Sequence, residues 1–349
     1  MTRIIGTDDL ATIVAEVGLT QFLDELIGRL RSSLCTFDPK TVDTMDRTGF
    51  HYDEPGLGLI EWMPAMTVGR RVSIKTVGYH PSNPELRGWP SVLATTSTYD
   101  TTDGRLLQVC EANVLTALRT GAASALATDV LARPESTVLG MVGCGAQAVA
   151  QIHAVSRVRP IDTVLAVDVA PAVAGSLAAR LAPLELGIEV HPLGPDALGR
   201  VMAEADILCT ATTVAPGSGP VVPESEHRPW LHINAVGADF PGKIELPARY
   251  LDRALVCPDV PGQCLAEGEA QQLRAADLGP DLAHVVRNAA EYVGYRQRLT
   301  VFDSTGWAFE DLVAAELVGD HAERLGLGVE VDLQPPTTDP YDPYLALNR

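Results

Sequence analysis

The chain has 349 residues, of which 46% are hydrophobic and 20% are charged, a composition typical of a globular enzyme large enough for two domains. Its formal net charge of −19 argues against nucleic acid or an anionic membrane surface as a partner. No apolar run is long enough to span a bilayer, and the beginning, MTRIIGTDDL, lacks the apolar core of a secretory signal.

The six cysteines are scattered without C-x-x-C spacing, which favours reduced thiols and a cytoplasmic location. The eight histidines form no H-E-x-x-H or similar pair, so the sequence predicts no metal site.

The first third of the chain predicts helix and then sheet. Residues 7–34 carry leucines at helical spacing and are expected to be helical. Four apolar segments follow between Met45 and Cys110, separated by turns that contain proline or glycine, and they predict an antiparallel sheet. TTDG at 101–104 is a hairpin signal between the last two of them. The expected strands are 56–66, 70–80, 91–100 and 105–110.

A long alanine-rich helix is expected over Asn113–Arg133, ended by Pro134. Strand and helix patterns then alternate, which predicts a parallel sheet with helices on both faces. Phe309–Leu325 is expected to be a last amphipathic helix, and the segment from Pro335 a surface arm. The expected strands of the parallel sheet are Thr137–Val142, Thr163–Val167, Ile188–His191, Ile207–Thr210, Leu231–Val236, Ala254–Val256 and Leu299–Phe302.

A glycine motif follows the first of these strands and matches G-x-G-x-x-[GA]. Gly143 permits a tight turn, Gly145 lets the backbone approach a pyrophosphate, and Ala148 keeps helix and sheet close. The helix N-terminus offers free N–H groups and a partial positive charge to the phosphates. Asp168 lies 168 − 148 = 20 residues further on, where a carboxylate binds the ribose and disfavours a 2′-phosphate, so NAD is expected rather than NADP. The alternative is a glycine-rich turn without a nucleotide.

These patterns together predict an α/β protein. We expect a Rossmann-type doubly wound parallel sheet over 126–305 that binds NAD. The remaining residues, 1–125 with 306–349, are expected to form an antiparallel-sheet domain.

Five charged residues stand in apolar or glycine-rich surroundings, where unpaired charges are costly. They are Arg47, Glu61, Lys75, Arg119 and Asp239. Three cations and two acids of this kind suggest a pocket for a zwitterion with a second amine, such as a diamino acid. Asp239 follows a strand of the parallel sheet, so it is expected at the carboxyl edge, near the nicotinamide, where it could move protons.

Each charge also has a plain structural alternative. Lys75 and Arg47 could be surface residues, and Glu61 and Arg119 could form a structural ion pair. Asp239 could cap its turn together with Gly237 and Gly242.

Longer motifs resemble those of the ornithine cyclodeaminase and mu-crystallin family over nearly the whole chain. They are IEWMP, KTVGYHP, ALRTGAASALA, VGCGAQAVAQ, HINAVGADFPGK with IELP, GEAQQL and VFDSTGWAFED. GADFPGK with its aspartate resembles the cyclodeaminase branch. RTGF at Arg47–Phe50 and the closing DPYDPYLAL are most similar to lysine cyclodeaminases of actinobacterial secondary metabolism.

The resemblance implies a cytoplasmic homodimeric ammonia-lyase that converts L-lysine to L-pipecolate and ammonia, with NAD kept bound and restored in each cycle. It also implies that the domain over 1–125 and 306–349 serves substrate binding and dimerisation. Ornithine as the preferred substrate, an NAD(P)-dependent amino-acid dehydrogenase or cyclic-imine reductase, and a mu-crystallin-like binding protein remain alternatives. By position, the resemblance assigns Arg47, Lys75 and Arg119 to the substrate carboxylate, Asp239 to acid/base catalysis, Glu61 to the reacting amine and Met63 to the apolar wall. It assigns Thr120, Gly143, Gly145, Ala146, Gln147, Asp168, Val236 and Ser304 to NAD.

Overall fold

The computed structural model describes residues 1–334, 336–342 and 344–345. Pro335, where the predicted surface arm begins, lies outside the described residues, while the described residues after it are mostly exposed. The chain forms two compact units. We call Met1–Gly18, Asp38–Leu115 and Ala314–Arg349 the mixed-sheet unit, and Leu19–Phe37 with Thr116–Val313 the parallel-sheet unit. The predicted limits of the folding domains, at residues 125 and 306, stay a prediction.

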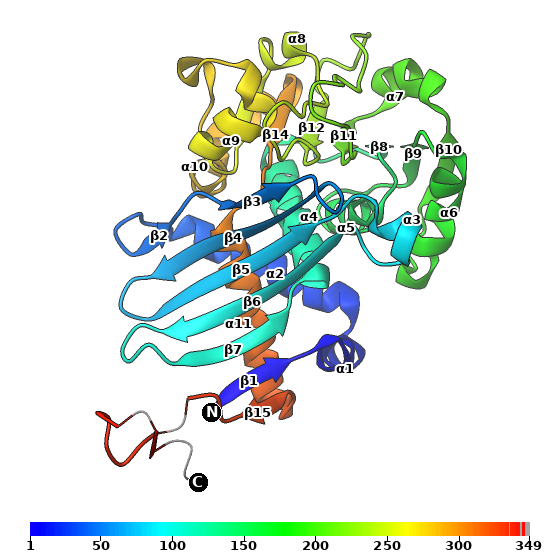
Figure 1. The fold of residues 1–349 in the computed structure, drawn as a ribbon. Helices are drawn as coiled ribbons and strands as arrows, with labels where there is room; N and C mark the ends of the chain where they lie inside the picture. Colours follow the sequence, from blue (N-terminus) through cyan, green and yellow to red (C-terminus); the bar gives the residue numbers. More distant parts are fainter. Residues whose placement is uncertain (335, 343, 346–349) are drawn as a thin grey trace. The chain divides into compact units, whose positions relative to one another are not determined.

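The mixed-sheet unit is built on an eight-stranded sheet in the order β15-β1-β7-β6-β5-β4-β2, with β3 also paired to β4 (Figure 1). All four predicted strands are present, and the predicted TTDG turn joins the last two. Strands β4 to β7 pair antiparallel as predicted. The sequence did not predict β1, β2, β3 and β15; of these, β1 pairs parallel with β7, so the sheet is mixed. Its elements are β1 (Thr2–Ile5), α1 (Thr7–Val17), β2 (Val42–Thr44), β3 (Thr48–Tyr52), β4 (Gly58–Thr67), β5 (Arg71–Tyr79), α3 (Asn83–Arg87), β6 (Val92–Asp100), β7 (Leu106–Glu111) and β15 (Val329–Val331).

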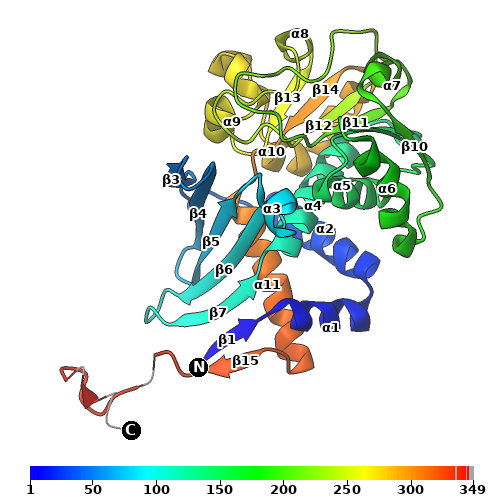
Figure 2. The ribbon, with the colours of Figure 1, turned by 45° about the vertical axis from the view of Figure 1, so that its right-hand side comes forward.

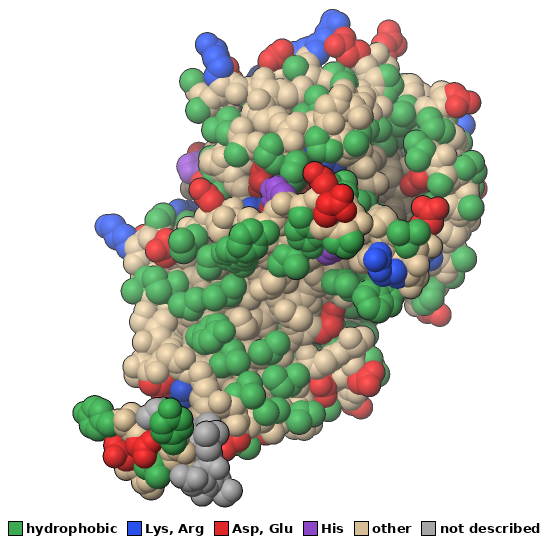
Figure 3. Space-filling model, in the orientation of Figure 1, with side chains coloured by type: hydrophobic (Ala, Val, Ile, Leu, Met, Phe, Trp, Pro, Cys, Tyr) green, Lys and Arg blue, Asp and Glu red, His purple; other side chains and the backbone are tan. Residues whose placement is uncertain are grey.

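The two faces of this sheet differ. In the middle of β4 and β5 every second side chain is buried (Glu61, Met63 and Ala65; Ser73 and Lys75), which is the alternation expected of a sheet covered on one side. On the other face, hydrophobic side chains gather over strands β4 to β7 in the space-filling view (Figure 3). Phe50 and Ile60 are among the exposed large hydrophobic residues of this unit.

The helical prediction for residues 7–34 was wrong in one respect. Gly18 has a φ of 89°, which separates α1 from α2 (Leu19–Cys35). A left-handed backbone of this kind cannot continue a helix and favours glycine. The predicted apolar stripe is nevertheless correct, since Phe22, Leu26 and Leu30 of α2 are fully buried.

The parallel-sheet unit has seven strands in the order β10-β9-β8-β11-β12-β14-β13, all parallel. Helices cover both faces, as predicted: α5 and α6 pack on one side, and α7 and α8 on the other (Figure 2). The elements are α4 (Asn113–Leu131, from Thr116 onward in this unit), β8 (Val138–Val142), α5 (Ala146–Ser156), β9 (Thr163–Val167), α6 (Pro171–Leu181), β10 (Glu189–Leu193), α7 (Leu198–Glu204), β11 (Ile207–Thr210), β12 (His232–Ala235), α8 (Ala248–Leu251), β13 (Leu255–Pro258), α9 (Pro261–Glu267), α10 (Leu282–Arg287), β14 (Thr300–Asp303) and α11 (Ala308–Leu325, to Val313 in this unit).

The carboxyl ends of four central strands are in register. Val142 of β8 pairs with Thr210 of β11, Thr210 with Ala235 of β12, and Ala235 with Asp303 of β14. The segments that follow these strands therefore meet at one edge of the sheet, where doubly wound folds bind their ligands. Among the described residues, no helix is both long and apolar enough to cross a membrane.

Candidate active site

The glycine turn after β8 has the geometry that the motif predicts. Gly143 has a φ of 85°, and a Cβ there would lie 2.6 Å from the carbonyl oxygen of Ala211. Gly145 caps the N-terminus of α5, and a Cβ there would meet no protein atom within 4 Å. Ala148 is fully buried between helix and sheet. The turn thus presents open backbone and a helix N-terminus, which suit a pyrophosphate.

Asp168 lies just after β9 and stabilises the glycine turn that follows β8 through hydrogen bonds. Its Oδ2 accepts a hydrogen bond from the Cys144 N–H at 2.8 Å, and its Oδ1 accepts one from Ala170 N–H at 2.8 Å. Arg180, which was not predicted as a site residue, also holds this turn. Its guanidinium donates to the carbonyl oxygens of Cys144 (2.6 Å) and Gly145 (3.1 Å). Arg180 lies on α6 and had no sequence signal, because its partners are 35 and 36 residues away.

The other residues assigned to NAD lie in the same unit. Val236 and Ser304 directly follow β12 and β14, and their backbone N–H groups continue the strand pairing. Ala146 and Gln147 begin α5, and the Gln147 amide donates to the carbonyl of Ala117 at 3.4 Å. Thr120 lies on α4, where its hydroxyl donates to the carbonyl of Thr116 at 2.8 Å. Val236, Ser304 and the glycine turn therefore share the carboxyl edge of the sheet.

Three buried carboxylates, none of which the sequence indicated, form a chain of hydrogen bonds that leads to the turn after β12. Asp303 accepts from the N–H of Glu269 (2.9 Å), Glu269 accepts from the N–H of Glu245 (2.7 Å), and Glu245 accepts from the N–H of Gly237 (3.0 Å). Burial raises the pKa of Asp303 to about 7, and burial also raises the pKa values of Glu269 and Glu245. This series fixes the turn that carries Asp239.

Asp239 itself makes an ion pair at the end of this series. Its Oδ1 accepts from the Nζ of Lys243 at 2.8 Å, and its side chain is 47% exposed. The turn-capping alternative is wrong, because the N–H of Gly237 bonds to Glu245 and that of Gly242 bonds to the Gln271 side chain. A carboxylate this accessible is able to exchange protons with a ligand or with water.

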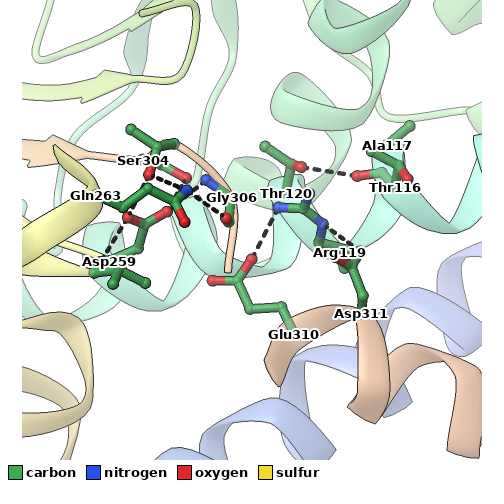
Figure 4. A network of polar contacts seen from close by, with 12 residues as sticks. Thr116, Ala117, Arg119, Thr120, Asp259, Gln263, Ser304, Gly306, Glu310 and Asp311 are labelled. Atoms are coloured by element: carbon green, nitrogen blue, oxygen red, sulfur yellow. Dashed lines mark hydrogen bonds and ion pairs between the residues drawn. The ribbon is translucent and has the colours of Figure 1, made fainter. Parts of the chain in front are cut away.

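Arg119 lies in a buried cluster of opposite charges (Figure 4). Its Nε donates to Oδ1 of Asp311 at 2.9 Å, and its Nη1 donates to Oε2 of Glu310 at 3.0 Å. Burial lowers the pKa of Arg119, but Asp311, Glu310 and Asp259 outweigh that effect and raise it overall. Burial raises the pKa of Glu310 to about 8, opposed by Arg119 and reinforced by Asp259 and Asp311.

Asp259 holds the turn after β14, which runs beside Arg119 (Figure 4). Its carboxylate accepts from Ser304 Oγ at 3.1 Å and from the N–H of Gly306 at 2.7 Å. Gln263 donates to the carbonyl of Gly306 at 3.0 Å. The Ser304 hydroxyl therefore fixes this turn.

A second charged cluster lies in the mixed-sheet unit. Glu61 of β4 is 5% exposed; its Oε2 lies 3.6 Å from Nη1 of Arg47, and its Oε1 lies 3.0 Å from Nε2 of His51. Met63 follows two residues later on the same buried face and pairs directly with Lys75 of β5. His51 was not predicted as a site residue; it pairs with Leu59, two residues before Glu61, and therefore lies on the same face of the sheet as Glu61.

The surface alternatives for Lys75 and Arg47 are wrong. Lys75 is 2% exposed, and the Arg47 side chain is 10% exposed. The alternative in which Glu61 and Arg119 form an ion pair is also wrong, because each has its own partners inside its own unit. Within the part of the chain that the structure describes, no group of three or more His, Cys, Asp or Glu side chains is arranged to hold a metal ion.

A parallel sheet with an open glycine turn, an acidic residue after the second strand and buried charges define an α/β enzyme of the dinucleotide-binding class. The comparisons with known proteins narrow this class. The chain belongs to the ornithine cyclodeaminase/mu-crystallin family, whose model matches residues 8–325.

Three relatives illustrate the match. The L-lysine cyclodeaminase of Streptomyces rapamycinicus is 42% identical over 344 residues, which cover 98% of this chain and 99% of that protein. A solved lysine cyclodeaminase structure, described as the basis for recognition of L-lysine, L-ornithine and L-2,4-diaminobutyric acid, is 45% identical with a TM-score of 0.94 and covers 99% of both chains. An archaeal alanine dehydrogenase dimer with bound NAD is 28% identical with a TM-score of 0.80, covering 95% of this chain and 99% of that one.

Proposed function

We propose that this protein is an L-lysine cyclodeaminase that forms L-pipecolate and ammonia. The observation that carries the proposal is Asp239, a solvent-accessible carboxylate on a fixed turn at the carboxyl edge of the parallel sheet. The GADFPGK sequence around it resembles the cyclodeaminase branch of the family. The sequence identity of 42–45% to lysine cyclodeaminases over nearly the full length supports the same activity.

NAD is the cofactor we propose. The open backbone at Gly145, the helix N-terminus of α5 and the carboxylate of Asp168 fit a dinucleotide with unmodified ribose hydroxyls. When bound, NAD would accept a hydride from the substrate Cα and return one to the ring carbon, so that the reaction has no net redox change. Thr120, Ala146, Gln147, Val236 and Ser304 are proposed contacts of the same cofactor.

The substrate carboxylate is assigned to Arg119, Arg47 and Lys75. All three are nearly buried, and a buried cation favours an anionic ligand because little water competes for it. Guanidinium groups suit a carboxylate because they offer two parallel N–H donors. Holding the carboxylate fixes the position of Cα, and orientation of this kind supplies much of the rate enhancement of an enzyme.

Asp239 is the proposed acid and base. It would take a proton from the terminal ammonium of lysine, which makes that amine able to attack the α-carbon and close the ring. It would then return the proton to the departing α-nitrogen, which leaves as ammonia. Glu61 would hold the reacting amine, and Met63 would form an apolar wall against the methylene chain.

L-Ornithine is the second candidate substrate, since the solved lysine cyclodeaminase is described as recognising it. The two amino acids differ by one methylene, which a pocket discriminates by about 1–3 kcal/mol. We therefore expect measurable turnover of L-ornithine to L-proline, with a lower kcat/KM than for L-lysine.

A homodimer through the mixed sheet is part of the proposal. Phe50 and Ile60 are 70% and 42% exposed, and the Phe50 and Trp62 rings pack with their centroids 5.7 Å apart on the open face. Exposed apolar surface is typical of faces that contact another chain, which supports the proposal. The related archaeal alanine dehydrogenase is described as a dimer. Sedimentation velocity of the wild-type protein and of Ile60→Asp tests this proposal, which predicts a dimer that the substitution weakens.

The function is tested by incubating the protein with NAD and either L-lysine or L-ornithine and measuring ammonia and the imino acid by mass spectrometry. We expect pipecolate from lysine without accumulation of NADH. A build-up of NADH would instead identify a dehydrogenase, and nucleotide binding without ammonia release would identify a binding protein.

Asp239→Asn tests the catalytic assignment. We expect at least a ~100-fold loss of turnover, because the amide cannot accept the proton, with unchanged affinity for NADH. Asp252→Asn, at an exposed position after α8, is the matched control and should keep full activity. Near-normal turnover by Asp239→Asn would refute this role.

A further inference from the structure

We infer that Glu310 and Asp311 are positioning residues that hold Arg119 for the substrate carboxylate, while Gly306 leaves room beside the guanidinium. This inference rests on the proposed function, because it takes Arg119 as the group that binds the carboxylate. It adds three residues of the VFDSTGWAFED segment to the site.

The two acids hold two different nitrogens of one guanidinium. They are neighbours at the start of α11, yet Asp311 accepts from Nε and Glu310 accepts from Nη1 (Figure 4). Two hydrogen bonds to separate nitrogens fix both the direction of the arginine side chain and the rotation of its plane. A free arginine loses considerable rotamer entropy when it binds a ligand, and here that loss has already occurred on folding.

The third nitrogen, Nη2, donates to no acceptor among the residues that the structure describes. It faces Gly306, which has a φ of 90°. A Cβ at Gly306 would lie 2.8 Å from Nη2 and 2.9 Å from Nη1, closer than side-chain carbons approach other atoms. Glycine is therefore favoured at this position for two reasons: its φ is positive, and a side chain would collide with the guanidinium of Arg119. Asp259 holds Gly306 in place through its backbone N–H at 2.7 Å.

The charge of the cluster is consistent with this role. Two ionised acids around one arginine would give a net negative charge, which repels a carboxylate. Glu310 Oε1 is fully buried and accepts no hydrogen bond from any residue that the structure describes, and burial raises the pKa of Glu310 to about 8. At neutral pH its carboxyl group therefore carries a proton, while Oε2 still accepts from Arg119. A neutral Glu310 leaves Arg119 and Asp311 as a balanced ion pair, and the remaining negative charge is that of Asp259, which accepts hydrogen bonds from the Ser304 hydroxyl and the Gly306 N–H.

The test compares removal of each acid with its conservative replacement. Glu310→Ala and Asp311→Ala remove a hydrogen bond to the guanidinium, whereas Glu310→Gln and Asp311→Asn keep an acceptor oxygen. Two affinities are measured for each variant: that of L-pipecolate for the NADH-bound protein, and that of NADH itself. Glu323→Gln, an exposed acid on the same helix, is the matched control.

We expect the alanine variants to bind L-pipecolate about 10- to 100-fold more weakly, the size of effect typical for a lost hydrogen bond to a charged group. The affinity for NADH should change less than about twofold, and the amide variants should recover most of the loss. Unchanged L-pipecolate affinity in the alanine variants would overturn the inference. An equal loss of NADH affinity, or no recovery in the amide variants, would also overturn it, because either result indicates a purely structural role.

The wild-type protein separates this inference from the proposed function. If it binds L-pipecolate but forms none from L-lysine, the proposed function fails, and the variant affinities still decide the inference. If it neither turns over L-lysine nor binds L-pipecolate, both are overturned.

Discussion

The two buried charge clusters have opposite compositions. In the mixed-sheet unit one acid, Glu61, lies between two basic side chains, those of Arg47 and His51. Glu61 and His51 belong to the hairpin of β3 and β4, and Arg47 directly precedes β3. His51 and Glu61 are only 10 residues apart in sequence. The His51 side chain is 47% exposed, so one side of this cluster is open to solvent.

In the parallel-sheet unit the arrangement is reversed, because one base, Arg119, lies between two acids. Glu310 and Asp311 are 191 and 192 residues away in sequence, and all three side chains are 5% exposed or less. The cluster near solvent is formed by residues close in sequence and is partly exposed, so we expect it to tolerate substitution. The enclosed cluster depends on the tertiary fold and is buried, so we expect it to hold a carboxylate in a fixed place. Substitutions should therefore cost more in the enclosed cluster.

The largest effect is expected for Arg119→Ala. It removes the proposed carboxylate contact and leaves two buried acids without their base, so kcat/KM for L-lysine should fall at least ~100-fold. Arg119→Lys should restore little, because an ammonium cannot replace the planar fork. Arg200→Ala, at an exposed position on α7, is the control for steady-state kinetics. A loss below about threefold for Arg119→Ala would show that Arg119 does not bind substrate.

A smaller effect is expected for Glu61→Gln. The amide keeps the size of the side chain and one acceptor oxygen, but it loses the charge that faces Arg47 and that is proposed to hold the substrate amine. We expect a ~10-fold decrease in kcat/KM with unchanged affinity for NADH. Glu54→Gln, an exposed acid of the same unit, should behave as the wild type. A loss larger than that of Arg119→Ala would reverse the proposed ranking of the two clusters.

Glu310→Gln should change how stability depends on pH. The folded protein raises the pKa of Glu310 from its usual 4.5 to about 8, so the folded state binds a proton that the unfolded state has released. The corresponding stability is fully present below pH ~4.5 and is lost as the pH rises through about 8. Thermal unfolding from pH 5 to 9 should show a shallower decline of Tm in the variant.

Some decline should remain in Glu310→Gln, because burial also raises the pKa of Asp303, to about 7. Glu323→Gln should keep the wild-type decline. An identical pH dependence in Glu310→Gln and the wild type would contradict a protonated Glu310.

The smallest effect is expected for His51→Ala. Its hydrogen bond to Glu61 is half exposed, and exposed contacts of this kind contribute about 1 kcal/mol or less. We expect kcat/KM to fall less than about fivefold and Tm to change little. A loss as large as that of Glu61→Gln would show that the open cluster is as rigid as the enclosed one.

The same contrast explains what the sequence could predict. The glycine turn, its strand and its helix were identifiable because the whole unit lies within 32 consecutive residues, 137–168, and each residue type follows from local geometry. The strands β4 to β7 were identifiable as apolar segments separated by turns that contain proline or glycine. Gly18 was missed because a single glycine inside a helical pattern is often tolerated.

The partners of Arg119 could not be predicted, since no local pattern joins α4 to α11. The carboxylate of Glu245 was missed for the same reason, because it binds the backbone of Gly237 in a turn and leaves no periodic signal. Only the resemblance to a family placed Arg119 and Asp239 in one proposed mechanism.

The most direct test of the account uses L-lysine labelled with deuterium at Cα and with ¹⁵N at the α-amine, supplied with NAD. We predict that the pipecolate retains the deuterium and lacks ¹⁵N, and that the ¹⁵N appears in ammonia without accumulation of NADH. Loss of deuterium to water, or ¹⁵N retained in the pipecolate, would contradict the proposed mechanism.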